Sequence, residues 1–76
     1  MSKDNNKDTL LIKVGLKIRC LRQQRGISQE ILAHEADLDR SYMGGVERGE
    51  RNISLKNLGK ISTALNIHLR EIMEDI

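Results

Sequence analysis

Apolar residues in the first third of the chain recur at helical intervals. After the polar stretch 1–8, positions 11, 14, 18 and 21 are Leu, Val, Ile and Leu. Spacings of three, four and three place these side chains on one face of a helix. Asp8 or Thr9 suits its first turn as a cap, and Gly26 suits its end. We expect a flexible tail over residues 1–8 and a helix from about Thr9 to Arg25.

Two short helices with a polar break between them follow. Ser28 is a natural cap for a helix over residues 29–36, and Asp39 for a second that ends at Gly49. Ala33 lies where these helices would cross, and Leu38 and Val46 supply apolar contacts on either side. A crossing near a right angle needs a small residue between apolar neighbours. The pattern therefore predicts a helix-turn-helix unit, whose second helix lies in the DNA major groove.

Gly44 and Gly45 lie inside the second helix of this unit. A glycine costs a helix interior roughly 0.5–1 kcal/mol relative to alanine. The missing side chains fit a close approach by another backbone or a ligand, and they fit equally well an exposed face that tolerates glycine. The sequence leaves both interpretations open.

Two more helices complete the chain. Ser54 caps a helix with apolar residues at positions 55, 58, 61 and 65, and Asn66 is suited to end it in a left-handed conformation. A fifth helix carries apolar residues at 69, 72 and 73. Five short helices with brief connections predict an all-α domain over residues 9–76.

The C-terminal region is rich in apolar residues for a domain of this size. A chain of 76 residues buries only about 60% of the surface that its unfolded form exposes, so burial against a second subunit would help it. The same residues could instead complete the core of one subunit. We predict a dimer interface at Ile67, Leu69, Ile72 and Met73.

Composition argues against an enzyme, a metal site and a membrane protein. Cys20 is the single cysteine, so it can form neither an internal disulfide nor a zinc site alone. His34 and His68 lie far apart, without metal-ligand spacing. No stretch approaches the roughly 18 apolar residues of a membrane span, and no signal peptide opens the chain. We expect no cofactor, and a cytoplasmic location.

Charged residues alternate in blocks along the chain. An acid-free basic run covers residues 13–25, a second basic group covers 40–60, and acidic residues lie between them and at the C-terminus. Such blocks can give a molecule one basic and one acidic face. They are equally compatible with ordinary solvated helix surfaces.

Several short segments together resemble a known family. Residues 26–30 read GISQE, residues 38–42 read LDRSY, and residues 46–49 read VERG. Over about residues 11–73 the chain resembles the Cro/C1-type (XRE) regulators, which include the lambda- and 434-type phage repressors. The segments DRSY, ERG and RNISL, at 39–42, 47–49 and 51–55, are similar to controller proteins of restriction–modification systems. These small dimeric regulators time expression of the endonuclease relative to the methyltransferase.

The resemblance implies a five-helix, lambda-repressor-like domain that binds double-stranded operator DNA. In such a domain the base contacts would come from Arg40, Ser41, Tyr42 and Gly45, although Gly45 has no side chain with which to read a base. Contacts to the DNA backbone would come from Gln29, Arg48, Arg51 and Asn52. Gln29 would also brace the recognition helix, and Arg22 and Glu47 would form a structural ion pair.

The resemblance also implies the assembly and the partners. A homodimer would place its two recognition helices about 34 Å apart, one turn of DNA, on a roughly palindromic operator. It would act as activator, repressor or both, with RNA polymerase as a candidate partner, and would associate with the bacterial nucleoid when bound. The alternative is an antitoxin or another protein-interaction module with the same fold. An antitoxin usually carries a toxin-binding extension, and a tail of about eight residues is short for such an interface. An adaptor that does not bind DNA should lack a base-reaching residue at the start of the recognition helix, whereas Arg40 is present there.

Overall fold

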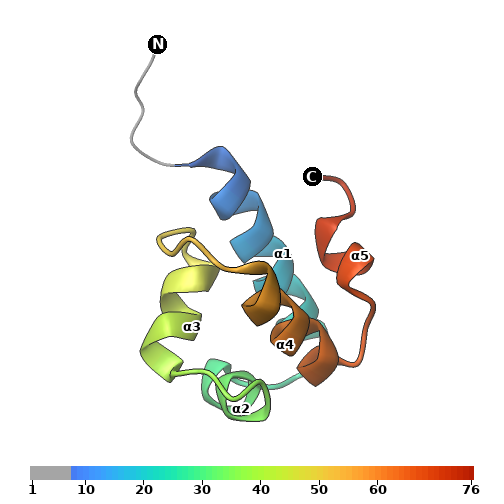
Figure 1. Ribbon diagram of the computed structural model, residues 1–76. Coiled ribbons are helices and arrows are strands. Elements are labelled where there is room, and N and C mark those ends of the chain that lie inside the picture. The colour runs from blue at the N-terminus through green and yellow to red at the C-terminus, as the bar shows by residue number, and fades with distance from the viewer. Residues whose placement is uncertain (1–7) are drawn as a thin grey trace.

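The computed structural model describes residues 8–76, and this part of the chain contains helices but no strand (Figure 1). The all-α prediction is confirmed. Residues 1–7 of the expected tail lie outside the described residues. The five helices are α1 (Thr9–Gln24), α2 (Gln29–Glu35), α3 (Arg40–Glu47), α4 (Leu55–Leu65) and α5 (Leu69–Met73).

Side-chain caps start the first four helices at the expected places. The side chains of Asp8, Ser28, Asp39 and Ser54 accept hydrogen bonds of 2.9–3.3 Å from backbone N–H groups two or three residues further on. Each bond satisfies one of the donors that a helix start leaves unpaired. Asp8 is therefore part of the α1 cap and not of a free tail, and it takes this role instead of Thr9.

The same left-handed turn ends α1 to α4. The residue with positive φ is Gly26, Asp37, Gly49 or Asn66, with φ between 58° and 75°. After each of them, the next residue donates its N–H to the carbonyl five positions back, over 2.8–3.4 Å. This pattern satisfies carbonyls that the helix leaves free. Three of the four residues were predicted as helix ends, and Asp37 was expected only in a polar break.

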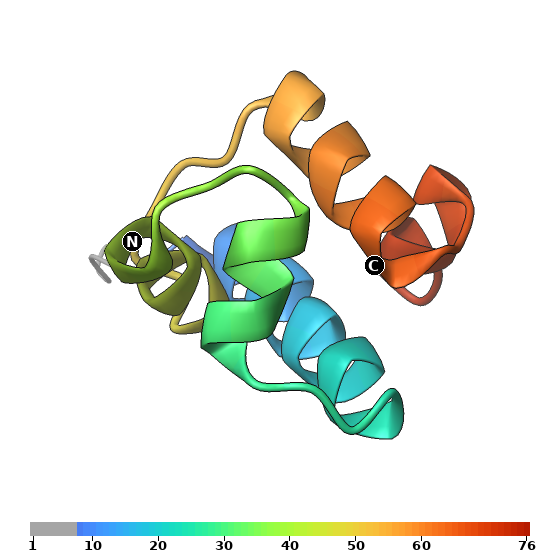
Figure 2. The same cartoon turned by 90° about the horizontal axis from the view of Figure 1, so that it is seen from below.

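The helices enclose one aliphatic core. In Figure 1, α1 runs through the middle of the molecule, with α3 on one side and α5 on the other. Viewed from below in Figure 2, α4 and α5 lie together, on the far side of the molecule from α3. α3 packs on α1 and α2, and α4 packs on α2 and α5. The largest fully buried side chains are Ile18, Leu32, Met43, Val46, Ile61, Leu65 and Ile72.

A close approach between α1 and the end of α3 fixes the position of α3. A Cβ atom on Gly15 would overlap the carbonyl oxygen of Val46, and it would lie only 2.8 Å from that of Glu47. Only glycine permits this contact, because the obstructing atoms belong to the backbone and cannot rotate away. The C-terminal half of α3 is thus held against α1, while Arg40 and Ser41 at its start are exposed.

Within residues 8–76, no helix is long and apolar enough to cross a membrane. In the same part of the chain, no cluster of His, Cys, Asp and Glu side chains could hold a metal ion.

Candidate nucleic-acid interface

The first turn of α3 offers exposed polar side chains. Arg40 and Ser41 are exposed, and Tyr42 is half-buried beside them. The side chain of Asp39 fixes this turn by accepting a 3.3 Å hydrogen bond from the N–H of Tyr42. Arg40 forms no ion pair with any described residue. Its guanidinium is therefore available to a partner outside the chain.

Tyr42 connects the exposed turn to two other segments. Asn57 of α4 donates a hydrogen bond of 3.1 Å from Nδ2 to the Tyr42 hydroxyl oxygen. The guanidinium carbon of Arg51, in the loop after α3, lies 5.8 Å from the centre of the Tyr42 ring. That distance fits a cation–π contact, worth about 0.5–1 kcal/mol at an exposed site. Tyr42 thus has both a packing role and an exposed edge. Asn57 was not among the predicted site residues.

The two glycines of α3 lie beneath arginine side chains. A Cβ on Gly45 would be 2.7 Å from Cγ of Arg51, and a Cβ on Gly44 would be 3.1 Å from Nη1 of Arg48. Both glycines are buried. The expectation that Gly45 contacts bases is therefore corrected, because Arg51 covers that position. Neither interpretation of the glycine pair describes this arrangement, because the glycines are not on an exposed face and the groups that approach them are side chains of the same subunit, not another backbone or a ligand.

A buried carboxylate holds the recognition helix in place. Glu47 is 4% exposed, and its two carboxylate oxygens accept hydrogen bonds from Arg22 Nε at 2.7 Å and Nη2 at 3.0 Å. Gln29 donates a third bond of 2.9 Å from Nε2. Arg22 also donates from Nη1 to the carbonyl oxygen of Ile27 at 2.8 Å. The bidentate pair fits the expected structural role of Arg22 and Glu47, and Gln29 does brace α3.

Cationic and polar side chains are also exposed at the C-terminal end of α3 and in the loop that follows it. Arg48 is exposed and forms a 3.0 Å ion pair with Glu50, which is also exposed. Such a surface pair is weak and easily exchanged for another anion. Arg51 and Asn52 are exposed in the same loop. Of the predicted contacts to the DNA backbone, Arg48, Arg51 and Asn52 are therefore exposed next to α3. The side-chain amide of Gln29 differs, because it is bonded to the buried Glu47, as Arg22 is.

The predicted dimer residues differ in their exposure. Ile72 is 0% exposed and Met73 is 41% exposed. Ile67 and Leu69 are partly buried and pack against the core. The assignment of Ile72 to a dimer interface is wrong, because that side chain completes the core of one subunit. Ile67, Leu69 and Met73 keep the exposed surface that such an interface needs.

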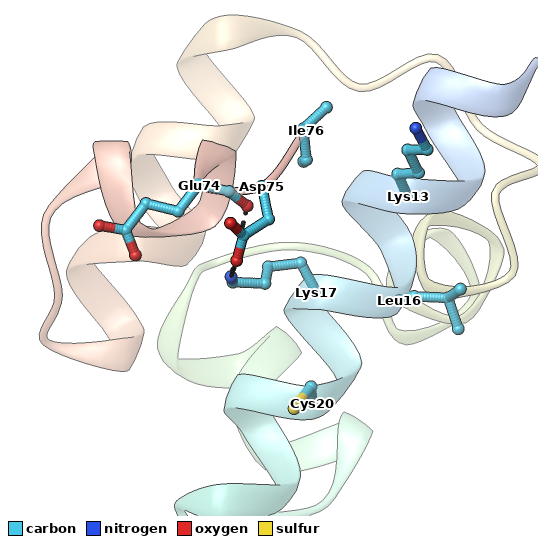
Figure 3. A pocket seen from close by; sticks show the side chains of 7 residues that line it. All are labelled: Lys13, Leu16, Lys17, Cys20, Glu74, Asp75 and Ile76. Atoms are coloured by element: carbon cyan, nitrogen blue, oxygen red, sulfur yellow. Dashed lines mark hydrogen bonds and ion pairs between the residues drawn. The ribbon is translucent and has the colours of Figure 1, made fainter.

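A shallow hollow lies beside α1 at the C-terminal end of the chain. It measures about 370 Å³, and Leu16, Cys20 and Ile76 contribute to its lining. Lys17 holds the C-terminal segment there through a 3.4 Å hydrogen bond to the carbonyl oxygen of Glu74 and a 3.9 Å ion pair with Asp75 (Figure 3). Leu16 on α1 is exposed beside this hollow.

Comparison with known proteins places this geometry among regulators. A helix-turn-helix family model matches residues 18–72. Control protein C.MunI from Mycoplasma sp is 47% identical over 66 residues, which cover 86% of this chain and 89% of that protein. The structure of the restriction–modification controller protein C.AhdI from Aeromonas hydrophila superposes with a TM-score of 0.84 at 54% identity, covering 86% of this chain and 98% of that one.

One similar structure includes DNA. C.Esp1396I bound to a 25 base pair operator site superposes with a TM-score of 0.82 at 37% identity, and the match covers 90% of each chain. The likeness therefore extends over nearly the whole domain and includes the recognition helix.

Proposed function

Because this chain belongs to the helix-turn-helix family, and within it to the restriction–modification controller proteins, we propose that it is a transcriptional regulator that binds double-stranded operator DNA. In this role it sets the expression of the genes of a restriction–modification system. It acts in the bacterial cytoplasm and associates with the nucleoid while bound. Its protein partner at an activated promoter is RNA polymerase.

The observation that carries the proposal is that α3 has exposed polar side chains in its first turn and is anchored to α1 and α2 at its other end. Arg40 and Ser41 project from this turn, and the Glu47 contacts hold its other end to α1 and α2. A guanidinium fork at that place can donate to O6 and N7 of one guanine together, which discriminates by about 1–3 kcal/mol. Ser41 and the exposed edge of Tyr42 contact neighbouring bases.

Side chains at the C-terminal end of α3 and in the loop after it contact the phosphates. Arg48, Arg51 and Asn52 are exposed in the adjacent loop. Gln29 has its side-chain amide at Glu47, so its assignment as a phosphate contact rests on the remaining N–H of that amide and on its backbone N–H at the start of α2. Phosphate contacts fix the position of a protein on the duplex, while base contacts carry the sequence information.

We propose further that two copies bind together, through surface that includes Ile67, Leu69 and Met73. Met73 is 41% exposed, and it lies on α5, away from α3 (Figure 1). A two-fold axis through this region would leave both recognition helices free to enter successive major grooves, about 34 Å apart. The operator is then roughly palindromic.

Selection of binding sites from random duplexes at a stated salt concentration tests this function. The complex formed on the selected site is then weighed by analytical ultracentrifugation. We expect a two-fold symmetric site that is bound by two chains. Recovery of no preferred sequence, with binding equal to that of unrelated DNA, would contradict the proposal and favour a protein-interaction module.

A further inference from the structure

We propose that Gly45 is a positioning residue, which seats Arg51 flush on the recognition helix so that Arg51 and Tyr42 meet DNA as one rigid unit. This inference rests on the proposed DNA binding and assigns the glycine a role in it. Gly45 contributes no contact to DNA itself. It acts through the side chain that covers it.

The seat is formed by the surface of α3 at Gly45 and Tyr42. These residues are three positions apart, so they lie on the same face of the helix. Arg51 passes over both, because its Cγ lies 2.7 Å from the place where a Gly45 Cβ would be, and its guanidinium lies over the Tyr42 ring. Its aliphatic part therefore rests on Gly45, and its charged end rests on the ring.

A side chain at position 45 would disturb this arrangement near the root of Arg51. The Cβ would lie 2.7 Å from Cγ, 3.2 Å from Nε and 3.5 Å from Cδ of Arg51. Carbon atoms in contact normally stay about 3.5–4.0 Å apart. Because Cγ is the second carbon of the side chain, a swing of the guanidinium alone cannot relieve the overlap. The whole side chain must leave α3 and lose its place over Tyr42.

Gly44 has a different environment, although it is the next residue. A Cβ at Gly44 would meet Nη1 of Arg48 at 3.1 Å and Oε1 of Gln29 at 3.5 Å. Nη1 is the far end of a flexible side chain and can move aside. The seat is thus specific to Gly45.

Tyr42 gives a readout that does not depend on DNA. It is the only aromatic residue of the chain, so the intrinsic fluorescence and the near-ultraviolet circular dichroism arise from this ring. Arg51→Ala removes the cation from the ring and changes both signals. If Gly45 seats Arg51, Gly45→Ala produces the same change, and Gly45→Ala added to Arg51→Ala produces no further change.

A double-mutant cycle on DNA tests the consequence for binding. The probes are a duplex with the selected site and a scrambled duplex of the same length and composition. We expect Gly45→Ala to weaken binding to the selected site by about tenfold and to lower the salt slope by about one, as Arg51→Ala does. In the Arg51→Ala background, Gly45→Ala should change neither quantity, because the displaced side chain is already absent.

Gly59→Ala is the matched control. Gly59 lies inside α4, and a Cβ there would meet nothing within 4 Å. It reports what a glycine-to-alanine change in a helix does without a clash, and it should leave the Tyr42 signals and the DNA affinity unchanged. The far-ultraviolet circular dichroism of all four variants establishes that the helices are retained.

The possible outcomes separate the seat from the wider function. An equal loss of affinity from Gly45→Ala with and without Arg51 would overturn the inference, since it would mean that the DNA itself approaches the helix backbone at Gly45. Unchanged Tyr42 signals in Gly45→Ala would overturn it as well. If the parent protein binds no duplex, the proposed function fails, and the Tyr42 signals still decide whether Gly45 seats Arg51.

Discussion

Replacing Arg22 with methionine should lower the free energy of unfolding by a large fraction, so that the variant unfolds at a much lower urea concentration than the parent protein. The variant loses two hydrogen bonds to Glu47, at 2.7 and 3.0 Å, and one to the carbonyl of Ile27 at 2.8 Å. Only 1% of the Glu47 side chain is exposed, so water cannot replace these donors. The carboxylate keeps a single bond, from Gln29. An uncompensated buried charge of this kind costs about 3–5 kcal/mol.

That loss is large compared with the stability of the whole domain. At roughly 0.05–0.15 kcal/mol per residue, a chain of 76 residues has a free energy of unfolding of about 4–11 kcal/mol. Urea titration followed by far-ultraviolet circular dichroism measures the change. Protein concentration is held constant throughout, because dimerisation would add to the apparent stability.

Glu47→Gln supplies the control that separates buried charge from lost packing. In the parent protein it removes the charged acceptor of Arg22 and should destabilise the fold. In the Arg22→Met background it removes the uncompensated charge and should restore part of the lost stability. The reasoning is refuted if Arg22→Met costs less than about 1 kcal/mol, the value of a surface pair. It is refuted equally if Glu47→Gln destabilises both backgrounds.

Three further changes probe the interface and its support. Arg40→Ala should cost about 1–3 kcal/mol at one operator position and relax the base preference there, and a repeated site selection with an unchanged preference would contradict this. Arg48→Gln should weaken binding to operator and unrelated duplexes alike and lower the salt slope by about one; a slope equal to that of the parent would remove Arg48 from the phosphate contacts. Gly15→Ala should lower the free energy of unfolding by about 3 kcal/mol or more, because its Cβ would overlap backbone carbonyl oxygens. The control Gly59→Ala should instead stabilise the domain by about 0.5–1 kcal/mol. Similar melting temperatures for these two variants would contradict the prediction and show that α1 and α3 can separate.

The local chemistry of helix ends made much of the fold predictable. Ser28 and Ser54 cap the helices that they were expected to cap, since a cap depends on residues within three positions of it. Gly26 and Asn66 have the positive φ expected at a helix end. Asp37 also has positive φ, which its polar side chain tolerates, but nothing in the local sequence demands that conformation.

Features that depend on distant contacts were not predictable in the same way. Ile72 and Met73 are neighbours of similar hydrophobicity, and only the packing of α5 against α1 and α4 decides which of them enters the core. The cover of Gly45 by Arg51 depends on the path of a loop. The bond from Asn57 to Tyr42 joins residues fifteen positions apart. The sequence shows that Asn57 can donate a hydrogen bond, but it does not show that Tyr42 accepts it.

The buried carboxylate of Glu47 lies at one end of α3, and the exposed turn with Arg40 lies at the other. Of the side chains proposed to read bases, Tyr42 is half-buried and packs against the core, whereas Arg40 and Ser41 are exposed and take no part in the contacts around Glu47. Substitutions at Arg40 and Ser41 can accumulate with little effect on the stability of the domain, because exposed positions away from packing contacts change stability by only about 0.5 kcal/mol. A regulator built in this way can drift toward a new operator by single steps, each of which leaves a folded protein for selection to act on.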